Sequence, residues 1–182
     1  MRQVGFSKFR KITSVIGLLS TTIAPPLHAQ DTLDPIDQWD ITKQETGDEA
    51  GVLLKVPQGQ TERDWEVQAR EERFKGIGLT MNAQDISERL VQRLGQACHD
   101  LTAETPEQHS IGDFEAVYVR LDCPKLRVGE EMLIIFSIAW VDVVDLQTKQ
   151  VVFKRLPTDE EVRMAKAFLL RPAQPVEWTP DS

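Results

Sequence analysis

The sequence is poor in the residues that most often carry out chemistry. Its 182 residues include two cysteines, three histidines and one tyrosine. The hydrolase signatures Gly-x-Ser-x-Gly, Ser-x-x-Lys and His-Glu-x-x-His do not occur. The glycine pair in residues 76–78 lacks the third glycine of a nucleotide-binding fingerprint, so we interpret it as a bend between a strand and a helix. The common sequence signatures of hydrolysis and nucleotide binding are therefore excluded.

A long apolar run is also missing from the start of the chain. The apolar stretch at 12–27 is interrupted by polar residues and two prolines, so it is shorter than the roughly 20 residues that cross a bilayer. No acidic residue precedes Asp31. Four basic residues stand before the apolar stretch, namely Arg2, Lys8, Arg10 and Lys11. This layout is typical of a secretory signal that is cut after a small residue.

We expect cleavage after Ala29 or Gln30, so the mature protein is predicted to be periplasmic or secreted. The alternative is an uncleaved membrane tether.

The C-terminal tail carries Trp178, which either packs on the domain or acts as a short docking segment. Four segments are expected: a signal peptide at 1–29, an irregular acidic lead-in at 30–35, one domain at 36–172 and the tail at 173–182.

The charge balance is acidic. The whole chain has 21 basic and 29 acidic residues, for a net charge of −8, and loss of the four basic residues of the signal leaves −12. Such a charge repels phosphate backbones and anionic lipid surfaces. We therefore expect no nucleic-acid partner and no electrostatic binding to a membrane surface. Because the apolar stretch is expected to be cleaved off, no stable membrane span is expected in the mature chain.

The two cysteines, Cys98 and Cys123, are predicted to form a disulfide, because an exported protein meets an oxidising compartment. Closing a loop of this length contributes roughly 3 to 4 kcal/mol in the chain-entropy model. A redox role is disfavoured by the absence of a Cys-x-x-Cys spacing, and a zinc site by the small number of thiols and histidines.

Three strands are expected first, at 38–43, 51–57 and 63–73. In the third, Trp65, Val67 and Ala69 alternate with polar residues, which is typical of a half-buried strand. A helix is the alternative for this segment, because it is rich in alanine, arginine and glutamate.

A helix should follow, capped by Asn82, with Asp85 in its first turn and Cys98 in or just past its last turn. A second helix is expected at 157–170, where Thr158 and Glu161 form a capping box. Pro172 ends it. The apolar faces of the two helices are Ile86, Leu90 and Leu94 in the first and Val162, Ala165 and Leu169 in the second.

Between the helices we expect a polar loop at 99–112 and three strands. The strand at 113–123 should bury Val117, Val119 and Leu121 on one face. The strand at 131–144 is apolar at both alternating sets of positions, which predicts a central strand covered on both faces. The last strand is expected at 149–156.

The predicted fold class is α+β, with the order βββαβββα, an antiparallel sheet of about six strands, two covering helices and one disulfide. This succession, with GVLLKVPQGQTERDWEVQ as a strand, a turn and a Trp-bearing strand, resembles the Mog1/PsbP-like family of small antiparallel-sheet domains. The resemblance covers residues 36–170 and concerns the order of elements. It implies a binding or accessory role rather than an enzymatic one.

Few residues of the sequence are candidates for a catalytic or binding role. His99 lies beside Asp100, which could orient it as a base, although interaction with a helix C-terminus is the simpler interpretation. The other histidine of the mature chain is His109. A binding patch is predicted at Trp140, Asp142 and Trp65, with a solvated turn as the alternative for Asp142. No catalytic, cofactor-binding or metal-binding residue is nominated.

The sequence therefore predicts an exported, non-catalytic binding or accessory module. Its expected partner is an envelope protein or a small apolar ligand. The alternative is a small periplasmic hydrolase that uses His99 or a pair of carboxylates.

Overall fold

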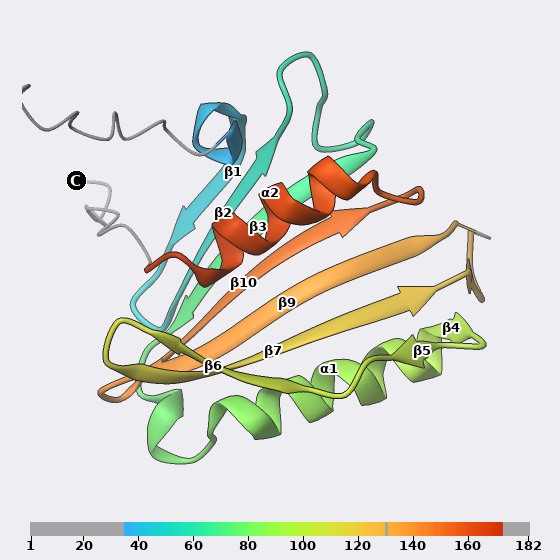
Figure 1. Ribbon diagram of the computed structural model, residues 1–182. Coiled ribbons are helices and arrows are strands. Elements are labelled where there is room, and N and C mark those ends of the chain that lie inside the picture. The colour runs from blue at the N-terminus through green and yellow to red at the C-terminus, as the bar shows by residue number, and fades with distance from the viewer. Residues whose placement is uncertain (1–34, 130, 173–182) are drawn as a thin grey trace, which may run out of the picture. The chain divides into compact units, whose positions relative to one another are not determined.

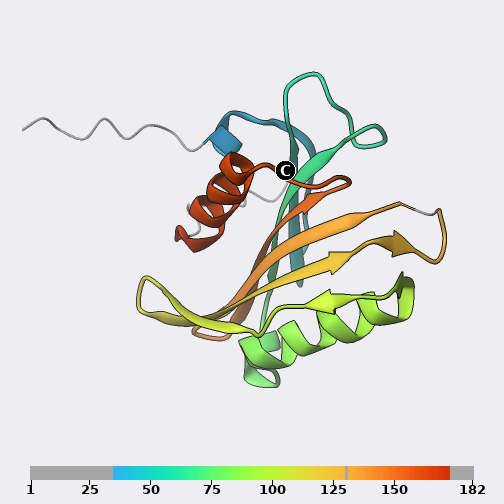
Figure 2. The same ribbon diagram turned by 45° about the vertical axis from the view of Figure 1, so that its right-hand side comes forward.

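A computed structural model describes residues 35–129 and 131–172, which fold into one antiparallel sheet with a helix on each face (Figures 1 and 2). The strand order is β1-β2-β3-β10-β9-β7, and β5 and β6 both pair with the outer side of β7. The elements are η1 (Pro35–Gln38), β1 (Asp40–Thr46), β2 (Ala50–Val56), β3 (Val67–Phe74), η2 (Ile77–Leu79), α1 (Ala83–Ala97), β4 (Cys98–His99), β5 (Thr102–Ala103), β6 (Glu107–Ile111), β7 (Phe114–Cys123), β8 (Lys125–Leu126), β9 (Leu133–Asp142), β10 (Asp145–Phe153) and α2 (Asp159–Leu170).

The α+β class, the antiparallel sheet and the two helices are confirmed. The sheet has eight strands instead of about six, and β4 and β8 form a separate two-stranded pair. The predicted signal peptide at 1–29, the greater part of the lead-in and the tail with Trp178 lie outside the described residues. Within the described ranges, no helix is both long and apolar enough to cross a membrane.

The two helix caps predicted from the sequence are present. Asn82 accepts a hydrogen bond from the backbone N–H of Asp85 at 2.9 Å, and the Asp85 carboxylate accepts one from the N–H of Asn82 at 3.0 Å. Thr158 and Glu161 form the same reciprocal pair at the start of α2. These bonds satisfy backbone donors that a helix leaves without partners, so each helix begins where its sequence predicts.

The segment before α1 is a strand, as the alternation of its apolar residues predicted. β3 begins at Val67 and pairs along its whole length with β10, from Val67 opposite Phe153 to Phe74 opposite Leu146. Val67 and Ala69 are buried on the face that α2 covers. Helix propensity was therefore outweighed by burial of one side of the segment.

The expected loop at 99–112 is the clearest correction. It contains β5 and β6, and β6 forms a hairpin with β7 in which Ile111 is opposite Phe114. β6 is an edge strand whose residues are mostly exposed, so it has no apolar alternation from which a strand could be recognised. Tyr118 alternates with Val117 and Val119, which were expected to form the buried face, and it is itself only 3% exposed because it belongs to the core beneath α2.

The last strand also begins earlier than predicted. β10 starts at Asp145 rather than at residue 149, and it contains the buried polar residues Thr148 and Lys149. Lys149 was the first residue of the predicted strand, whereas residues 145–148, which include Thr148, were interpreted as a turn because buried polar side chains are rare unless partners satisfy them.

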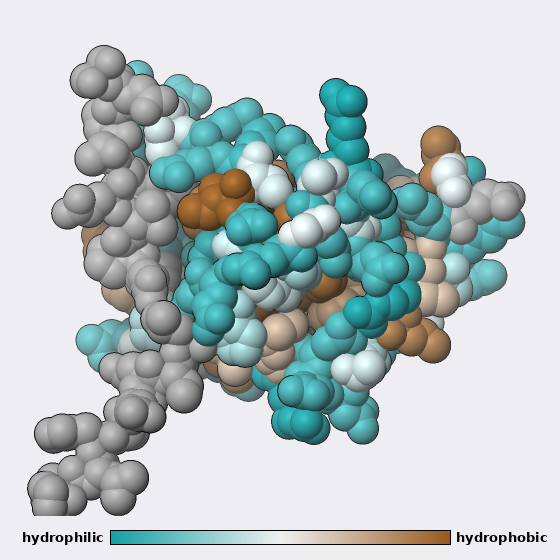
Figure 3. Space-filling view, turned by 90° about the horizontal axis from the view of Figure 1, so that it is seen from above, coloured by the Kyte–Doolittle hydropathy of each residue, from teal (hydrophilic) through white to brown (hydrophobic). Residues whose placement is uncertain are grey.

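Two cores lie on opposite sides of the sheet. On the α2 face, Phe136 and Phe153 meet edge to face and pack with Phe168 of the helix. On the α1 face, smaller clusters join Leu90 and Leu94 of the helix to β7 and β9. The surface viewed in Figure 3 is mainly hydrophilic, and its apolar residues form small separate groups.

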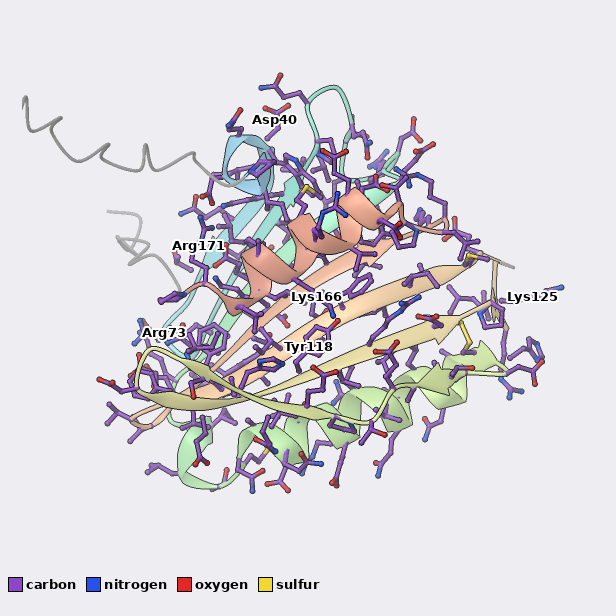
Figure 4. The ribbon with its side chains drawn as sticks, in the orientation of Figure 1. Asp40, Arg73, Tyr118, Lys125, Lys166 and Arg171 are labelled. Carbon is purple, nitrogen blue, oxygen red and sulfur yellow. A yellow bond between two sulfur atoms is a disulfide. The ribbon has the colours of Figure 1, made fainter. Side chains whose placement is uncertain are left out.

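The disulfide is confirmed. Cys98 and Cys123 are bridged, with Cα atoms 5.8 Å apart. The bridge joins the end of α1 to the end of β7, and the β4–β8 pair lies beside it. In Figure 4 it lies at the end of the sheet marked by Lys125, whereas Arg73 marks the opposite end. The bridge fixes one end of α1 to the sheet.

Candidate binding groove beside helix α1

Helix α1 covers only part of its face of the sheet. It packs on β7 and β9, near the β6 edge (Figure 1), and leaves the neighbouring part of β10 and β3 beside it. A cavity of about 320 Å³ lies between the helix and these strands. We call this cavity the α1 groove.

The floor of the groove is made by side chains of three adjacent strands. Its position follows from the register, because Thr148 is opposite Ala139 on one side and Glu72 on the other. Alternate residues of a strand point to the same face, so one side of each strand contributes. The floor residues are Glu72 and Phe74 of β3, Leu146, Thr148 and Gln150 of β10, and Ser137 and Ala139 of β9.

One end of the groove is closed by the residues that join β3 to α1. The backbone N–H of Gly78 donates to the carbonyl of Val144 at 2.8 Å. A Cβ atom at Gly78 would lie 2.5 Å from Cγ1 of Val141, so only glycine allows this close approach. The segment is thereby held against the β9–β10 turn, and Ile77 and Met81 line the groove from it. The sequence correctly indicated a bend at 76–78.

A second set of bonds holds the same turn. Gly76 has a φ of 72°, which favours glycine, and its N–H donates to Oδ1 of Asp145 at 3.0 Å. Nε of Arg73 donates to Oδ2 of the same carboxylate at 3.0 Å. This hydrogen bond from Arg73 is the main reason why the pKa of Asp145 is lowered.

The wall of the groove is the side of α1 that faces β10. Ile86 and Leu90 provide apolar surface, and the buried Ser87 lies between them. Arg89 and Arg93 line the groove from the exposed side of the helix. Among the described residues, neither arginine has a hydrogen-bond or ion-pair partner.

The acidic side chain that lines the groove, Glu72, is paired within the protein. The carboxylate of Glu72 forms an ion pair with Arg70 and accepts a hydrogen bond from Oγ1 of Thr148 at 3.3 Å. Its charge is therefore compensated within the protein, whereas the charges of Arg89 and Arg93 are not. The groove is mainly apolar with two unpaired cations at its rim.

The predicted patch of Trp140, Asp142 and Trp65 is divided by the structure. Trp140 is 2% exposed in β9 and lies in the core beneath α2. Asp142 follows at the end of the same strand and accepts a hydrogen bond from Nε2 of Gln147 at 3.0 Å. Trp65 precedes β3 and lies under Nζ of Lys154, 4.4 Å from the ring centre. Because β3 and β10 are antiparallel, Trp65 lies at the other end of the sheet.

The two histidines are on separate elements. His99 is exposed in β4, opposite Lys125, and Asp100 follows it with a φ of 56°. Nε2 of His109 lies 3.2 Å from the carboxylate of Glu107 on β6, and the ring of His109 meets Tyr118 edge to face. The structure therefore does not bring the two histidines into one site.

Tyr118 is a second polar feature, on the α2 face. Figure 4 places it near Lys166, whose Nζ lies 5.5 Å from the centre of its ring. The hydroxyl is buried and has no hydrogen-bond partner among the described residues. Burial raises the pKa of Tyr118 to about 12, helped by Glu104 and Glu107. The phenol is therefore protonated at neutral pH and cannot act as a base there.

Lys149 is a buried cation at the end of α2. Its ammonium group donates to the carbonyl of Arg171 at 3.0 Å and to that of Phe168 at 3.4 Å, so it satisfies acceptors that the helix leaves free. Burial lowers the pKa of Lys149 to about 8, and Glu71 opposes that shift. The group is 1% exposed and serves the packing of α2 on the sheet.

A network of charges surrounds this lysine. Lys55 lies 3.6 Å from the carboxylate of Asp37 and 3.7 Å from that of Glu71. Arg171 binds Asp37 through both terminal nitrogens, which is the main cause of the lowered pKa of Asp37. The network connects η1, β2, β3 and the end of α2. Across the two described ranges, no group of three or more histidine, cysteine or acidic side chains is arranged to hold a metal ion.

No protein-family model matches the chain, and no curated protein matches it in sequence. The function is therefore inferred from the geometry of the groove and of the residues that surround it.

Sequence reasoning did not find the groove as a site. It correctly gave the wall residues Ile86 and Leu90 as the apolar face of a helix, and it placed a bend at 76–78. The floor was missed because the last strand was predicted to begin at residue 149, so Leu146 and Thr148 were not assigned to it. The unbalanced pair Arg89 and Arg93, four residues apart on a helix, was the available signal.

Proposed function

We propose that this chain is an exported, non-catalytic module that binds a small apolar ligand in the α1 groove. The observation that carries the proposal is the groove itself. Its volume of about 320 Å³ lies at the lower end of the range of about 300–1,000 Å³ for ligand pockets. Most of its exposed lining surface is apolar, although half of its fourteen lining residues are polar or charged; ligand sites likewise combine apolar surface with polar groups that orient the ligand.

The disulfide supports the exported location. Bridged cysteines persist in oxidising compartments and are rare in the cytosol. The test is the intact mass of the protein recovered from the cell envelope, which should correspond to a chain that begins after residue 29 or 30. Recovery of the full-length chain from the cytosol with both thiols free would contradict export.

Binding can be tested with Nile red, a neutral dye that fluoresces in apolar surroundings. We expect the dye to bind the purified protein and to be displaced by dodecanol. Gln150→Trp, which adds an indole to the groove floor, should weaken dye binding at least tenfold. Gln147→Trp is the matched control, because residue 147 lies on the same strand but points to the opposite face.

Both variants must retain a cooperative thermal unfolding transition for the comparison to apply. If dye binding is absent, or is weakened equally by the two substitutions, the groove is not the binding site. The hydrolase alternative is tested by a substrate screen, in which turnover that is lost in His99→Ala would replace this proposal.

A further inference from the structure

The two arginines at the rim of the α1 groove indicate the chemistry of its ligand. Most arginines in the described part of the chain have partners; Arg73, Arg120 and Arg155, for example, bind carboxylates. Arg63, Arg89, Arg93 and Arg163 do not, although the chain has an excess of acidic residues; of these four, only Arg89 and Arg93 line the groove. They lie one helical turn apart on the same side of α1, where like charges repel.

The nearby carboxylates are already engaged. Asp85, one turn before Arg89, accepts the capping bond from the N–H of Asn82. Glu72, across the groove, is bound to Arg70 and Thr148. A ligand anion at the rim would therefore be the first close partner of both guanidinium groups. Arginine binds a carboxylate through two parallel hydrogen bonds, so the pair suits that head group.

The size of the groove limits the apolar part of the ligand. One turn of a partner helix is about 10–12 Å across and 5.4 Å long, which requires more space than the roughly 320 Å³ available. A single alkyl chain is narrower. It could lie along Phe74, Met81 and Leu146 and leave its polar end at the helix.

We infer that the α1 groove binds a single-chain fatty acid. The alkyl chain packs on the apolar side chains Phe74, Met81 and Leu146, and the carboxylate is held by Arg89 and Arg93. This inference rests on the proposed function and adds the ligand class and the two residues that recognise its head group.

The test compares three ligands with the same alkyl chain, each below its micelle concentration and near neutral pH. Dodecanoate, dodecanol and dodecyltrimethylammonium are titrated against protein-bound Nile red. We expect dodecanoate to bind about tenfold more tightly than dodecanol, as a charge-assisted hydrogen bond predicts, and the cation to bind more weakly than either. In the double variant Arg89→Gln/Arg93→Gln, the ratio of dodecanoate to dodecanol affinity should fall to about one.

The matched control is Arg63→Gln/Arg163→Gln, which removes two exposed arginines that do not line the groove. It should keep the wild-type ratio. Equal binding of dodecanoate and dodecanol by the wild type, or a ratio that survives Arg89→Gln/Arg93→Gln, would overturn the fatty-acid inference and leave the proposed function standing.

Two further outcomes are informative. A 14-residue peptide of leucine and glutamate that displaces the dye better than dodecanoate would overturn the inference in favour of an acidic amphipathic segment. If none of the ligands displaces the dye and Gln150→Trp has no effect on it, the proposed function fails together with the inference.

Discussion

The two faces of the sheet are closed in different ways. Beneath α2, a continuous core that includes Phe136 and Phe168 fills the space, and Lys149 satisfies the carbonyls at the helix end. Beneath α1, the helix is displaced towards the β7 edge and a cavity remains beside it. The polar groups of the α2 face are largely compensated inside the protein, whereas Arg89 and Arg93 of the α1 face are not. On the proposed function, the α2 face serves stability and the α1 face binds the ligand.

The largest expected difference between the faces comes from one substitution made on each. Phe136→Ala removes a ring that is 0% exposed and should lower the free energy of unfolding by about 3 to 5 kcal/mol. Phe74→Ala removes a half-buried ring from the groove floor and should cost about 1 to 2 kcal/mol. Urea unfolding measures both. Equal costs would show that the groove face is packed as tightly as the other.

Loss of the disulfide should have the next largest effect on stability. The bridge closes a loop with a sequence separation of 25, so Cys98→Ser/Cys123→Ser should lower the free energy of unfolding by about 3 to 4 kcal/mol. Because the bridge ties α1 to β7, Nile red binding should weaken as well. A double variant that is as stable as the wild type and binds the dye equally well would contradict the role given to the bridge.

Lys149, on the α2 face, should make the free energy of unfolding depend on pH. Its pKa falls from 10.5 to about 8 on folding, so between these pH values the unfolded chain binds more protons than the folded one. The free energy of unfolding should therefore rise with pH from about 8 to 10.5, by about 3 kcal/mol in total. Below about pH 8 Lys149 is protonated in both states, so it adds no further pH dependence to the free energy of unfolding.

The measurement is urea unfolding at pH values between about 7 and 9.5, which keeps the analysis below the ordinary pKa of tyrosine. Above that range Tyr118, whose folded pKa is about 12, acts in the opposite direction because the folded state retains its proton. Lys149→Met should flatten the rise. An equally steep rise in that variant would assign the pH dependence to another group.

The smallest of these effects concerns the end of the groove. Gly78→Ala forces a methyl group against Val141 and the carbonyl of Val144 and should cost about 1 to 3 kcal/mol, with weaker dye binding because Ile77 is displaced. Gly95→Ala in α1 is the control, since its Cβ would lie 3.8 Å from Leu101, an ordinary contact. This second variant should be more stable than the wild type, because alanine favours a helix. The opposite ranking would refute the close approach at Gly78.

The parts of the fold that depend on local pattern could be predicted from the sequence. The Asn82 cap of α1, the capping box of α2, the apolar face of α1 and the strand at Val67 follow from spacing that each segment contains by itself. The Asp85 half of the box at α1 was expected only as a charge favoured by the helix dipole. The disulfide required only the inferred compartment and the count of two cysteines.

The parts that depend on tertiary context could not be predicted. β6 is stabilised by pairing with β7 rather than by its own residues, and Lys149 is buried because the end of α2 supplies acceptors for it. The groove exists because α1 lies over β7 and β9 and not over β10, and no local pattern encodes that displacement. Trp140 was wrongly predicted to belong to a binding patch, because the helix that covers it, α2, is distant in the sequence.

The most direct test of the account is an NMR measurement of where an alkyl ligand lies. With carbon-13-labelled protein and unlabelled dodecanol, we expect intermolecular nuclear Overhauser effects from the alkyl protons to the methyl groups of Met81 and Leu146. No such effects are expected at Val151, which is buried on the α2 face. Contacts confined to the α2 face, or an absence of contacts at a saturating ligand concentration, would contradict the claim that the α1 groove is the binding site.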